Sequence, residues 1–259
     1  MDILFNPILY QTVVASMAAL AVIVFIALQR ITPGYGILYN SKWGPAISNR
    51  TGWIIMEAPV FFAMLLLWLM SPRRAEAAPA AMASLFLLHY FQRSFIFPLM
   101  LRGNSRMPVA IVTSGIIFNL INAYMLGGWI FYVSPPGSYP ASWLASPMFI
   151  TGTAVFFAGM AINWQSDHIV RHLRKPGDTR HYIPRGGMFR YVTSANYFGE
   201  FLEWTGFAIL TWSAAGAVFA LWTFANLAPR AAATHRRYIR EFGDEYSSLG
   251  RKYILPFIY

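Results

Sequence analysis

Two apolar stretches of this 259-residue chain carry ionisable side chains that such stretches rarely contain. Glu57 follows Trp53 by one helical turn and precedes Pro59, whose missing N–H frees a carbonyl and permits a kink beside the carboxylate. Tyr90 and Arg93 are spaced i, i+3, so a helix would present them on one face. An ionisable group in lipid is unfavourable unless it faces a cavity or a partner, and both stretches are therefore candidate sites of chemistry. For Glu57 the alternative is a structural ion pair with an arginine of a neighbouring helix.

Polar residues also recur at helical spacing further along the chain. One set, at i, i+4, i+8 and i+11, would form a single stripe on a helix: Asn163, Asp167, Arg171 and Arg174. Its alternative interpretation is a solvated face with internal Asp-to-Arg pairing. Glu200 and Glu203, at i, i+3, cannot both ionise comfortably in a dry environment without cationic or hydroxyl partners. We expect these glutamates and Asn196 to form a second polar wall that faces the first.

The amino-acid composition indicates that membrane-spanning helices must position these polar groups. Apolar residues make up 57% of the chain and charged residues only 12%, against roughly 45–50% and 25% in soluble domains. The mean hydropathy is +0.46. Ten acidic residues are too few to solvate a surface of this size. We therefore expect an all-α integral membrane protein, in which residues 1–259 form a single polytopic membrane domain.

Apolar tracts long enough to cross a ~30 Å hydrocarbon core cover residues 8–28, 53–70, 77 to about 97, 107–133, 147–164 and 201–228. Lys and Arg gather after the first, third and fifth tracts and in the tail from Arg230, which predicts that these regions are cytoplasmic. The tail can return to that side only if 201–228 crosses twice, with a turn near 213–216. About seven helices result, with the N-terminus outside. Arg73 and Arg74, beside Glu76, are the exception to this scheme.

Several classes of site are not expected from the sequence. The chain has no Cys, which excludes disulfides and thiolate chemistry. His168 and His172 are the only i, i+4 histidine pair, and they lack a nearby third ligand, so no metal site is predicted. The net charge of +10 is assigned to cytoplasmic loops at anionic headgroups, because no basic run carries a nucleic-acid reader motif. No strand pattern is visible. The Gly186-Gly187 loop could contact an anion or could simply be a turn.

Several runs together resemble the steroid 5α-reductases over essentially the whole chain, with the closest similarity to the type 2 enzymes. The runs cover residues 53–59, 89–93, 159–177, 183–189, 195–204 and 255–259. The specific part is Asn163-x-x-Ser-Asp167 joined to Arg174-Lys-Pro-Gly. The terminal Pro-Phe-Ile is less specific, since related membrane methyltransferases and sterol reductases have similar tails.

This resemblance implies an enzyme that uses NADPH to reduce the C4–C5 double bond of a 3-oxo-Δ4 steroid, such as testosterone or progesterone. In that family the residues matching Glu57 and Tyr90 engage the 3-oxo group. The residues that match its cofactor contacts are Tyr35, Trp53, Arg106, Asn163, Asp167, Arg174, Asn196, Glu200 and His235. The chain departs from the pattern at Met56, where mammalian enzymes carry Gln, and in the length of the loop before Arg106.

The expected chemistry agrees with the residue types. Hydride addition to the β-carbon of an enone builds negative charge on the ketone oxygen, which preorganised donors stabilise. Tyr90 is a suitable donor, while Glu57 either donates as the neutral acid or, ionised, orients the Tyr90 hydroxyl. Arg171 joins the cofactor set, because Arg171, Arg174, Lys175 and Arg185 crowd the cytoplasmic mouth where a 2′-phosphate would bind.

Two other functions compete with this interpretation. A membrane methyltransferase of the isoprenylcysteine type would bind S-adenosylmethionine in a similar cavity, but it needs no Tyr90 and Glu57 pair. A sterol-binding or transport protein would need repeat symmetry or broken helices, and the sequence shows neither. The expected partners are the steroid and the lipid bilayer, with no nucleic acid and no obligate protein partner. The membrane is either a bacterial inner membrane or the endoplasmic reticulum, with the cofactor side cytoplasmic.

Overall fold

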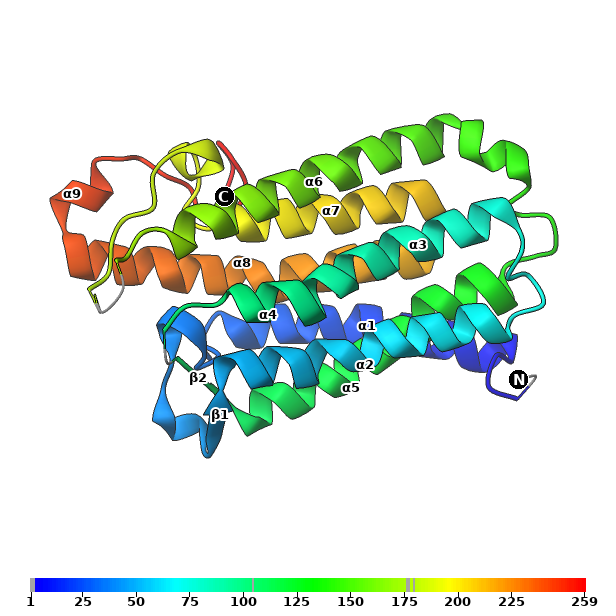
Figure 1. The fold of residues 1–259 in the computed structure, drawn as a ribbon, viewed down its shortest axis with the longest axis horizontal. Helices are drawn as coiled ribbons and strands as arrows, with labels where there is room; N and C mark the ends of the chain where they lie inside the picture. Colours follow the sequence, from blue (N-terminus) through cyan, green and yellow to red (C-terminus); the bar gives the residue numbers. More distant parts are fainter. Residues whose placement is uncertain (1–2, 104, 176–177, 179) are drawn as a thin grey trace.

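The computed structural model describes residues 3–103, 105–175, 178 and 180–259. Its long helices lie side by side along one axis (Figure 1). They are α1 (Pro7–Leu28), α2 (Asn49–Met70), α3 (Ala77–Phe91), α5 (Val109–Gly128), α6 (Pro147–Arg171), α7 (Ala195–Thr211) and α8 (Ala214–Phe242). A π-helical turn, Gln92–Ile96, joins α3 to the short α4 (Phe97–Met100), and a second, Trp129–Val133, extends α5. A four-residue helix, α9 (Asp244–Ser247), lies in the tail.

Local sequence explains where several helices begin. Asn6 caps α1 by accepting hydrogen bonds from the N–H groups of Ile8 and Leu9, with Pro7 at the first helical position. Serine side chains cap three further helices in the same way: Ser48 at α2, Ser146 at α6 and Ser213 at α8. These caps satisfy N–H groups that the helix itself leaves without partners.

Within the described residues, four helices are long and apolar enough to cross a membrane: α1, α2, α5 with its π-helical extension, and α6. Together with the composition, they identify a membrane protein. Two of these helices extend beyond the apolar tracts predicted from the sequence. α2 begins at Asn49, before the tract 53–70, and α6 continues past the tract 147–164 to Arg171. The predicted all-α class is confirmed in this helical content.

The long tract 201–228 is divided between two helices, as expected. α7 ends at Thr211, Trp212 adopts a left-handed conformation with φ of 45°, and α8 begins at Ala214. Both helices extend into polar sequence at the other end. The N-terminal half of α7 thereby carries Asn196, Glu200 and Glu203 into the bundle.

Glycines bring α6 and α7 into backbone contact. A Cβ added at Gly159 would lie 2.3 Å from the backbone N of Glu203, and one added at Gly206 would lie 2.4 Å from the backbone N of Phe156. Gly152 and Gly199 are equally tight against the facing backbone. Small residues allow such close approach, which is how membrane helices associate without a hydrophobic driving force between them. This contact fixes the polar residues of α6 against those of α7.

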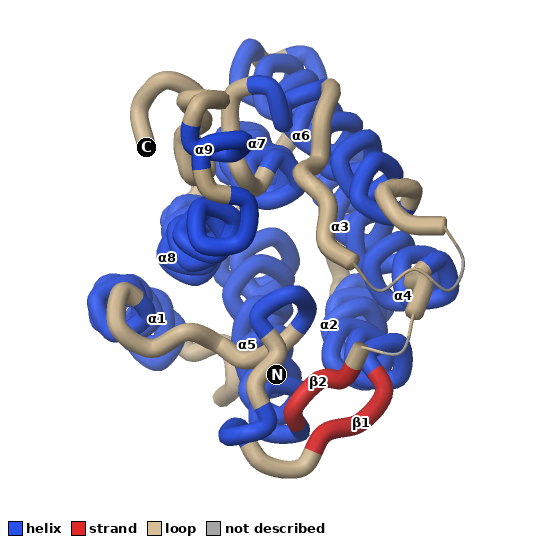
Figure 2. The backbone as a smooth tube through the Cα atoms, turned by 90° about the vertical axis from the view of Figure 1, so that its left-hand side faces the viewer, coloured by secondary structure: helices blue, strands red, loops and turns tan. Residues whose placement is uncertain are grey.

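A small sheet contradicts the expectation of no strands. β1 (Ala46–Ser48) pairs antiparallel with β2 (Arg106–Pro108), with Ile47 opposite Met107. The ribbon lies at one end of the bundle, just before α2 and α5 begin (Figure 2). Three-residue strands between glycine and proline breaks are too short to show alternation in the sequence.

The two ends of the bundle carry different segments of the chain. The start of α1 and the loops around residues 71–76 and 134–146 lie at one end, whereas β1, β2, α9 and the C-terminus lie at the other (Figure 1). Arg73, the predicted exception, forms a 3.0 Å ion pair with Glu76 and donates a 2.6 Å hydrogen bond to Ser134 Oγ. The Arg73 charge is therefore paired with an acidic residue within that end of the bundle.

Candidate active site

A cavity of about 740 Å³ lies inside the bundle. Its wall includes seven of the predicted site residues, from four of the long helices and the loop after α1: Tyr35, Trp53, Glu57, Tyr90, Asp167, Asn196 and Glu200. Apolar side chains of α1, α5 and α8 complete it, among them Met17, Leu20, Phe118, Phe219 and Trp222. One compartment thus joins a charged region to an apolar one.

Glu57 is buried on α2, and α5 provides its hydrogen-bond partner. Asn119 Nδ2 donates a 3.1 Å hydrogen bond to Glu57 Oε2 and a 2.9 Å hydrogen bond to the carbonyl of Met56. The partner is therefore an amide, and not the arginine of the alternative interpretation. Met56 itself packs against Gly115, where an added Cβ would lie 2.5 Å from its side chain.

Tyr90 is buried on α3 among aromatic rings. Its ring centroid lies 4.6 Å from that of Phe86, 4.9 Å from that of His89 and 5.7 Å from that of Trp204. Asn122 Nδ2 donates a 3.3 Å hydrogen bond to the phenol oxygen. Rings on three sides and one amide at the oxygen leave the phenol little freedom to turn.

Arg93 is the cation at the centre of the charged region. Its Nη1 lies 3.4 Å from Asp167 Oδ2, and its Nη2 lies 3.5 Å from Glu200 Oε2. The guanidinium carbon also lies 4.4 Å from the ring centroid of Trp53. A planar guanidinium suits such a mixture of paired carboxylate and aromatic face. Arg93 lies on the π-helical turn Gln92–Ile96, and such distortions of a helix are frequent at functional sites.

The two predicted polar walls meet between α6 and α7. Asn196 Nδ2 donates a 3.3 Å hydrogen bond to Asp167 Oδ1, and Asn163 Nδ2 donates a 2.9 Å hydrogen bond to the Asn196 carbonyl. Asn163 therefore lies behind the cavity wall and supports Asn196. The stripe is shorter than expected, since α6 ends at Arg171 and Arg174 lies beyond it. His172 ends the helix, with its Nδ1 2.7 Å from the His168 carbonyl.

His89 and Glu203 form a second buried pair beside Tyr90. His89 Nδ1 lies 2.8 Å from Glu203 Oε1, and both side chains are almost completely buried. The second wall therefore faces α3 as well as α6: Glu200 pairs with Arg93, and Glu203 pairs with His89. Each glutamate has a separate partner, which answers the difficulty of placing two carboxyls one turn apart.

Arg230 and Tyr35 close the cavity near the loop after α1. The guanidinium carbon lies 3.5 Å from the Tyr35 ring centroid, and Nε donates a 2.6 Å hydrogen bond to the hydroxyl of Tyr197. Nη1 and Nη2 donate to the carbonyls of Pro33 and Tyr35. Burial raises the pKa of Tyr35, although the neighbouring charge of Arg230 acts in the opposite direction. The Tyr35 hydroxyl therefore stays protonated near neutral pH.

Besides Asn163, four predicted cofactor residues lie outside the cavity lining. Arg106 is exposed in β2 and donates a 2.6 Å hydrogen bond to the Ala46 carbonyl. Arg171 is the last residue of α6 and is half-exposed, and Arg174 lies beyond the helix and is exposed.

His235 Nδ1 lies 2.7 Å from Thr193 Oγ1, so it contacts the cavity through Thr193. Thr234 and Tyr238 of the same helix line the cavity wall directly. Arg185, in the predicted basic cluster, pairs with Glu245 at 3.1 Å.

Sequence reasoning missed several residues at this site. Asn119 and Asn122 carry no charge and lie within an apolar tract, so only their i, i+3 spacing marked them. Arg230 was counted as part of a basic tail, although it directly follows a proline at the end of the apolar tract. The sequence around His89 indicates no role for it, because its partner Glu203 is more than a hundred residues away.

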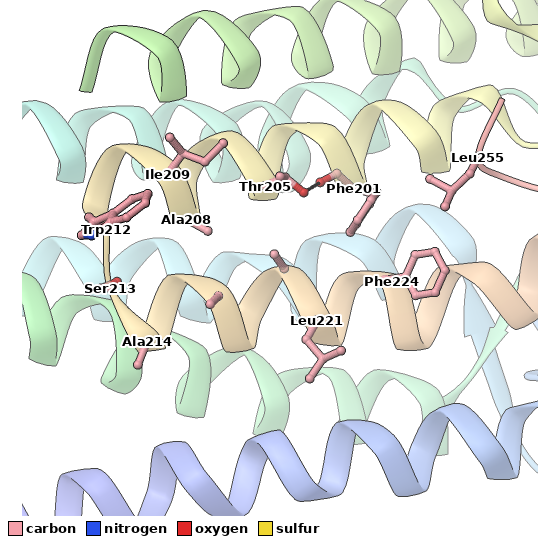
Figure 3. A pocket seen from close by; sticks show the side chains of 12 residues that line it. Phe201, Thr205, Ala208, Ile209, Trp212, Ser213, Ala214, Leu221, Phe224 and Leu255 are labelled. Carbon is pink, nitrogen blue, oxygen red and sulfur yellow. Dashed lines mark hydrogen bonds between the residues drawn. The ribbon is translucent and has the colours of Figure 1, made fainter. Parts of the chain in front are cut away.

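A second cavity, of about 750 Å³, lies between α7 and α8. Its lining is almost entirely apolar, with Trp212 at one end and Leu255 at the other (Figure 3). The hydroxyl of Thr205 is committed to the Phe201 carbonyl of its own helix. None of the predicted site residues lines this cavity, so the charged cavity is the candidate active site. Among the described residues, no group of three or more His, Asp and Glu could hold a metal ion.

Comparison with known proteins agrees with this class of protein, a helical membrane protein with a charged cavity. The family model described as 3-oxo-5-alpha-steroid 4-dehydrogenase matches residues 105–259. The chain is 42% identical to human 3-oxo-5-alpha-steroid 4-dehydrogenase 1 over 82% of this chain and 81% of that protein. It is 37% identical to steroid 5-alpha-reductase DET2 of Arabidopsis thaliana, over 87% of each chain.

The chain belongs to the 3-oxo-5-alpha-steroid 4-dehydrogenase family, the steroid 5α-reductases. The predicted family is thereby confirmed. The nearer similarity to its type 2 members stays a prediction.

Proposed function

We propose that this protein reduces the C4–C5 double bond of 3-oxo-Δ4 steroids, with NADPH as the hydride donor. The observation that carries the proposal is that Glu57 of α2 and Tyr90 of α3 line one cavity with the Arg93, Asp167 and Glu200 cluster. Family membership supports the same reaction class, since the relatives are named for steroid 5α-reduction and 3-oxo-steroid 4-dehydrogenation.

The charged region has the donors and acceptors that a nicotinamide dinucleotide needs. Asp167, Glu200 and the amide of Asn196 can bind hydroxyl and carboxamide groups, while Trp53 and Tyr35 offer aromatic faces. Arg171 and Arg174 lie where α6 ends and are suited to phosphate. We assign these residues to the cofactor, together with Asn163 and His235 as supports from behind the wall and Arg106 at the rim. When bound, NADPH supplies the hydride.

The chain's own contribution to the reaction lies at the ketone oxygen. As the β-carbon (C5) of the enone accepts hydride, negative charge develops on the 3-oxo group. Uptake of a proton from solvent at C4 then completes the reduction. The Tyr90 hydroxyl donates to that oxygen, and Glu57 donates as the neutral acid or orients the hydroxyl as the carboxylate. Apolar side chains around both groups exclude water, which strengthens these interactions. The apolar part of the cavity suits the steroid rings.

The proposal extends to the number of membrane crossings. α3 with its π-helical turn and α4, α7, and α8 lie beside the four apolar helices and have comparable lengths within the described chain. We propose that all seven cross the membrane. In this topology the β1–β2 end is cytoplasmic and the N-terminus lies on the opposite side.

Purified protein decides between reduction and methyl transfer. It is incubated with NADPH or with S-adenosylmethionine, and progesterone or testosterone is then added. We expect loss of nicotinamide absorbance together with a 5α-reduced product. Methylated product without NADPH oxidation would favour the methyltransferase, and steroid binding without turnover of either cofactor would favour a binding protein.

A further inference from the structure

Two asparagines of α5 contact the two proposed reactive groups. Asn119 and Asn122 are spaced i, i+3, so they lie on one face of the helix, and both are buried, at 5% and 0% exposure. Asn119 donates to Glu57 of α2, and Asn122 donates to Tyr90 of α3. A single helix therefore reaches both groups, although these groups belong to two other helices.

We propose that Asn122 and Asn119 are positioning residues for the reduction, an inference that rests on the proposed function. Asn122 Nδ2–H donates a hydrogen bond to the phenol oxygen of Tyr90. Because that oxygen already accepts a hydrogen bond from Asn122, the phenol's own hydrogen is available to the ketone in the cavity. The same N–H also stabilises the negative charge that the phenol oxygen gains as it donates.

The orientation of the Asn122 amide is what matters. Asn122 Oδ1 is buried and has no hydrogen-bond partner among the described residues. Were the amide reversed, this oxygen would accept the phenol hydrogen and hold it away from the ketone. The inference requires Nδ2 toward the phenol, which leaves Oδ1 without a partner among the described residues and keeps the Tyr90 hydrogen free.

Asn119 acts on the carboxyl group in a related way. Its Nδ2 bonds Glu57 Oε2 and also the Met56 carbonyl, so the amide ties the carboxyl to the backbone of α2. One carboxyl oxygen is thereby fixed, and the other is left for the substrate or for Tyr90. This arrangement serves either protonation state of Glu57.

Double-mutant cycles test the assignment. Asn122→Leu keeps a similar volume and removes the amide, and it is combined with Tyr90→Phe, while Asn119→Leu is combined with Glu57→Gln. The single-turnover rate of NADPH oxidation and NADPH binding are measured in each variant. In the wild-type background we expect Asn122→Leu to lower the rate about tenfold, the value of one hydrogen bond of ~1.4 kcal/mol, with NADPH binding unchanged. In the Tyr90→Phe background the further loss should be less than about twofold.

The crossed combinations are the matched controls. Asn122→Leu should still lower the rate when Glu57 is Gln, because its partner is Tyr90. A loss from Asn122→Leu that is the same with and without the Tyr90 hydroxyl would overturn the inference. A wild-type protein that does not oxidise NADPH with steroid overturns the proposed function instead. The same cycle measured on unfolding temperatures then decides whether Asn122 holds the Tyr90 hydroxyl, and additive changes would show that it does not.

Discussion

The guanidinium of Arg93 lies 3.4 Å from the carboxylate of Asp167, and this contact joins the π-helical turn after α3 to the last turn of α6. Glu200 of α7 shares the same cation. The positive charge of Arg93 thus connects the π-helical turn after α3 to both α6 and α7. The two carboxylates would be costly to bury without it, because an unpaired ion in a dry environment loses its hydration without compensation.

Replacing Arg93 should therefore destabilise the protein strongly. Arg93→Gln leaves Asp167 and Glu200 without a cation, and we expect a loss of about 3–5 kcal/mol, as when one partner of a buried pair is removed. Thermal unfolding in detergent measures it. The exposed Arg190→Gln serves as control, and an equal effect from both would contradict the prediction.

Loss of either proposed reactive group should reduce turnover while the fold persists. We expect Tyr90→Phe to lower the rate about 10²–10³-fold, the usual cost of one oxyanion donor, with NADPH still bound. Glu57→Gln keeps the size and can still donate a hydrogen bond. Near-normal activity of Glu57→Gln would show that the acid is dispensable, and collapse would indicate proton donation or orientation of Tyr90. Single-turnover NADPH oxidation is measured beside unfolding temperature. Wild-type rates in both variants would remove this pair from the reactive centre.

The close approach of α6 and α7 should be sensitive to one methyl group. Gly159→Ala places a Cβ about 2.3 Å from the Glu203 backbone nitrogen, so the helices must separate. We expect a lower unfolding temperature and lower activity, since Asp167 and Asn196 depend on the same contact. Ala158→Ser adds one atom at the neighbouring exposed position and should change neither.

Arginines at the end of α6 should favour NADPH over NADH. Arg174 lies beyond the end of α6 and is exposed. Its guanidinium is therefore accessible to the 2′-phosphate of NADPH in the proposed cofactor site. Arg174→Ala should raise the NADPH concentration needed for half-maximal rate and leave the NADH value unchanged. Arg190→Ala is the control. Equal use of both cofactors by the wild-type protein would reassign these arginines to lipid headgroups.

The proposed orientation can be tested by labelling, because the chain has no cysteine. Pro136→Cys places a thiol in the exposed loop between α5 and α6, and Ser248→Cys places one in the exposed tail. In sealed vesicles with the cytoplasmic face inside, an impermeant maleimide should label only Pro136→Cys. The opposite pattern would invert the topology.

Much of the bundle could be predicted because lipid demands long apolar helices and lysine and arginine mark one side. The division of 201–228 into two helices followed from that constraint, whereas the end of α6 depended on how His172 meets the His168 carbonyl. Glu57 and Tyr90 could be predicted to line a cavity because a carboxyl and a phenol stand out against apolar residues. Asn119 was not found, since an amide reveals its role only through the partner that folding brings to it.

The β1–β2 ribbon lies directly before α2 and α5. Pairing of Ile47 with Met107 is flanked by hydrogen bonds from Asn49 N to the Ser105 carbonyl and from Val109 N to the Pro45 carbonyl. The two helices are thus fastened to each other at their first residues and cannot slide or part there independently. The register between α2 and α5 is thereby set at their first residues, and the 3.1 Å hydrogen bond from Asn119 to Glu57 further along the same two helices depends on that register.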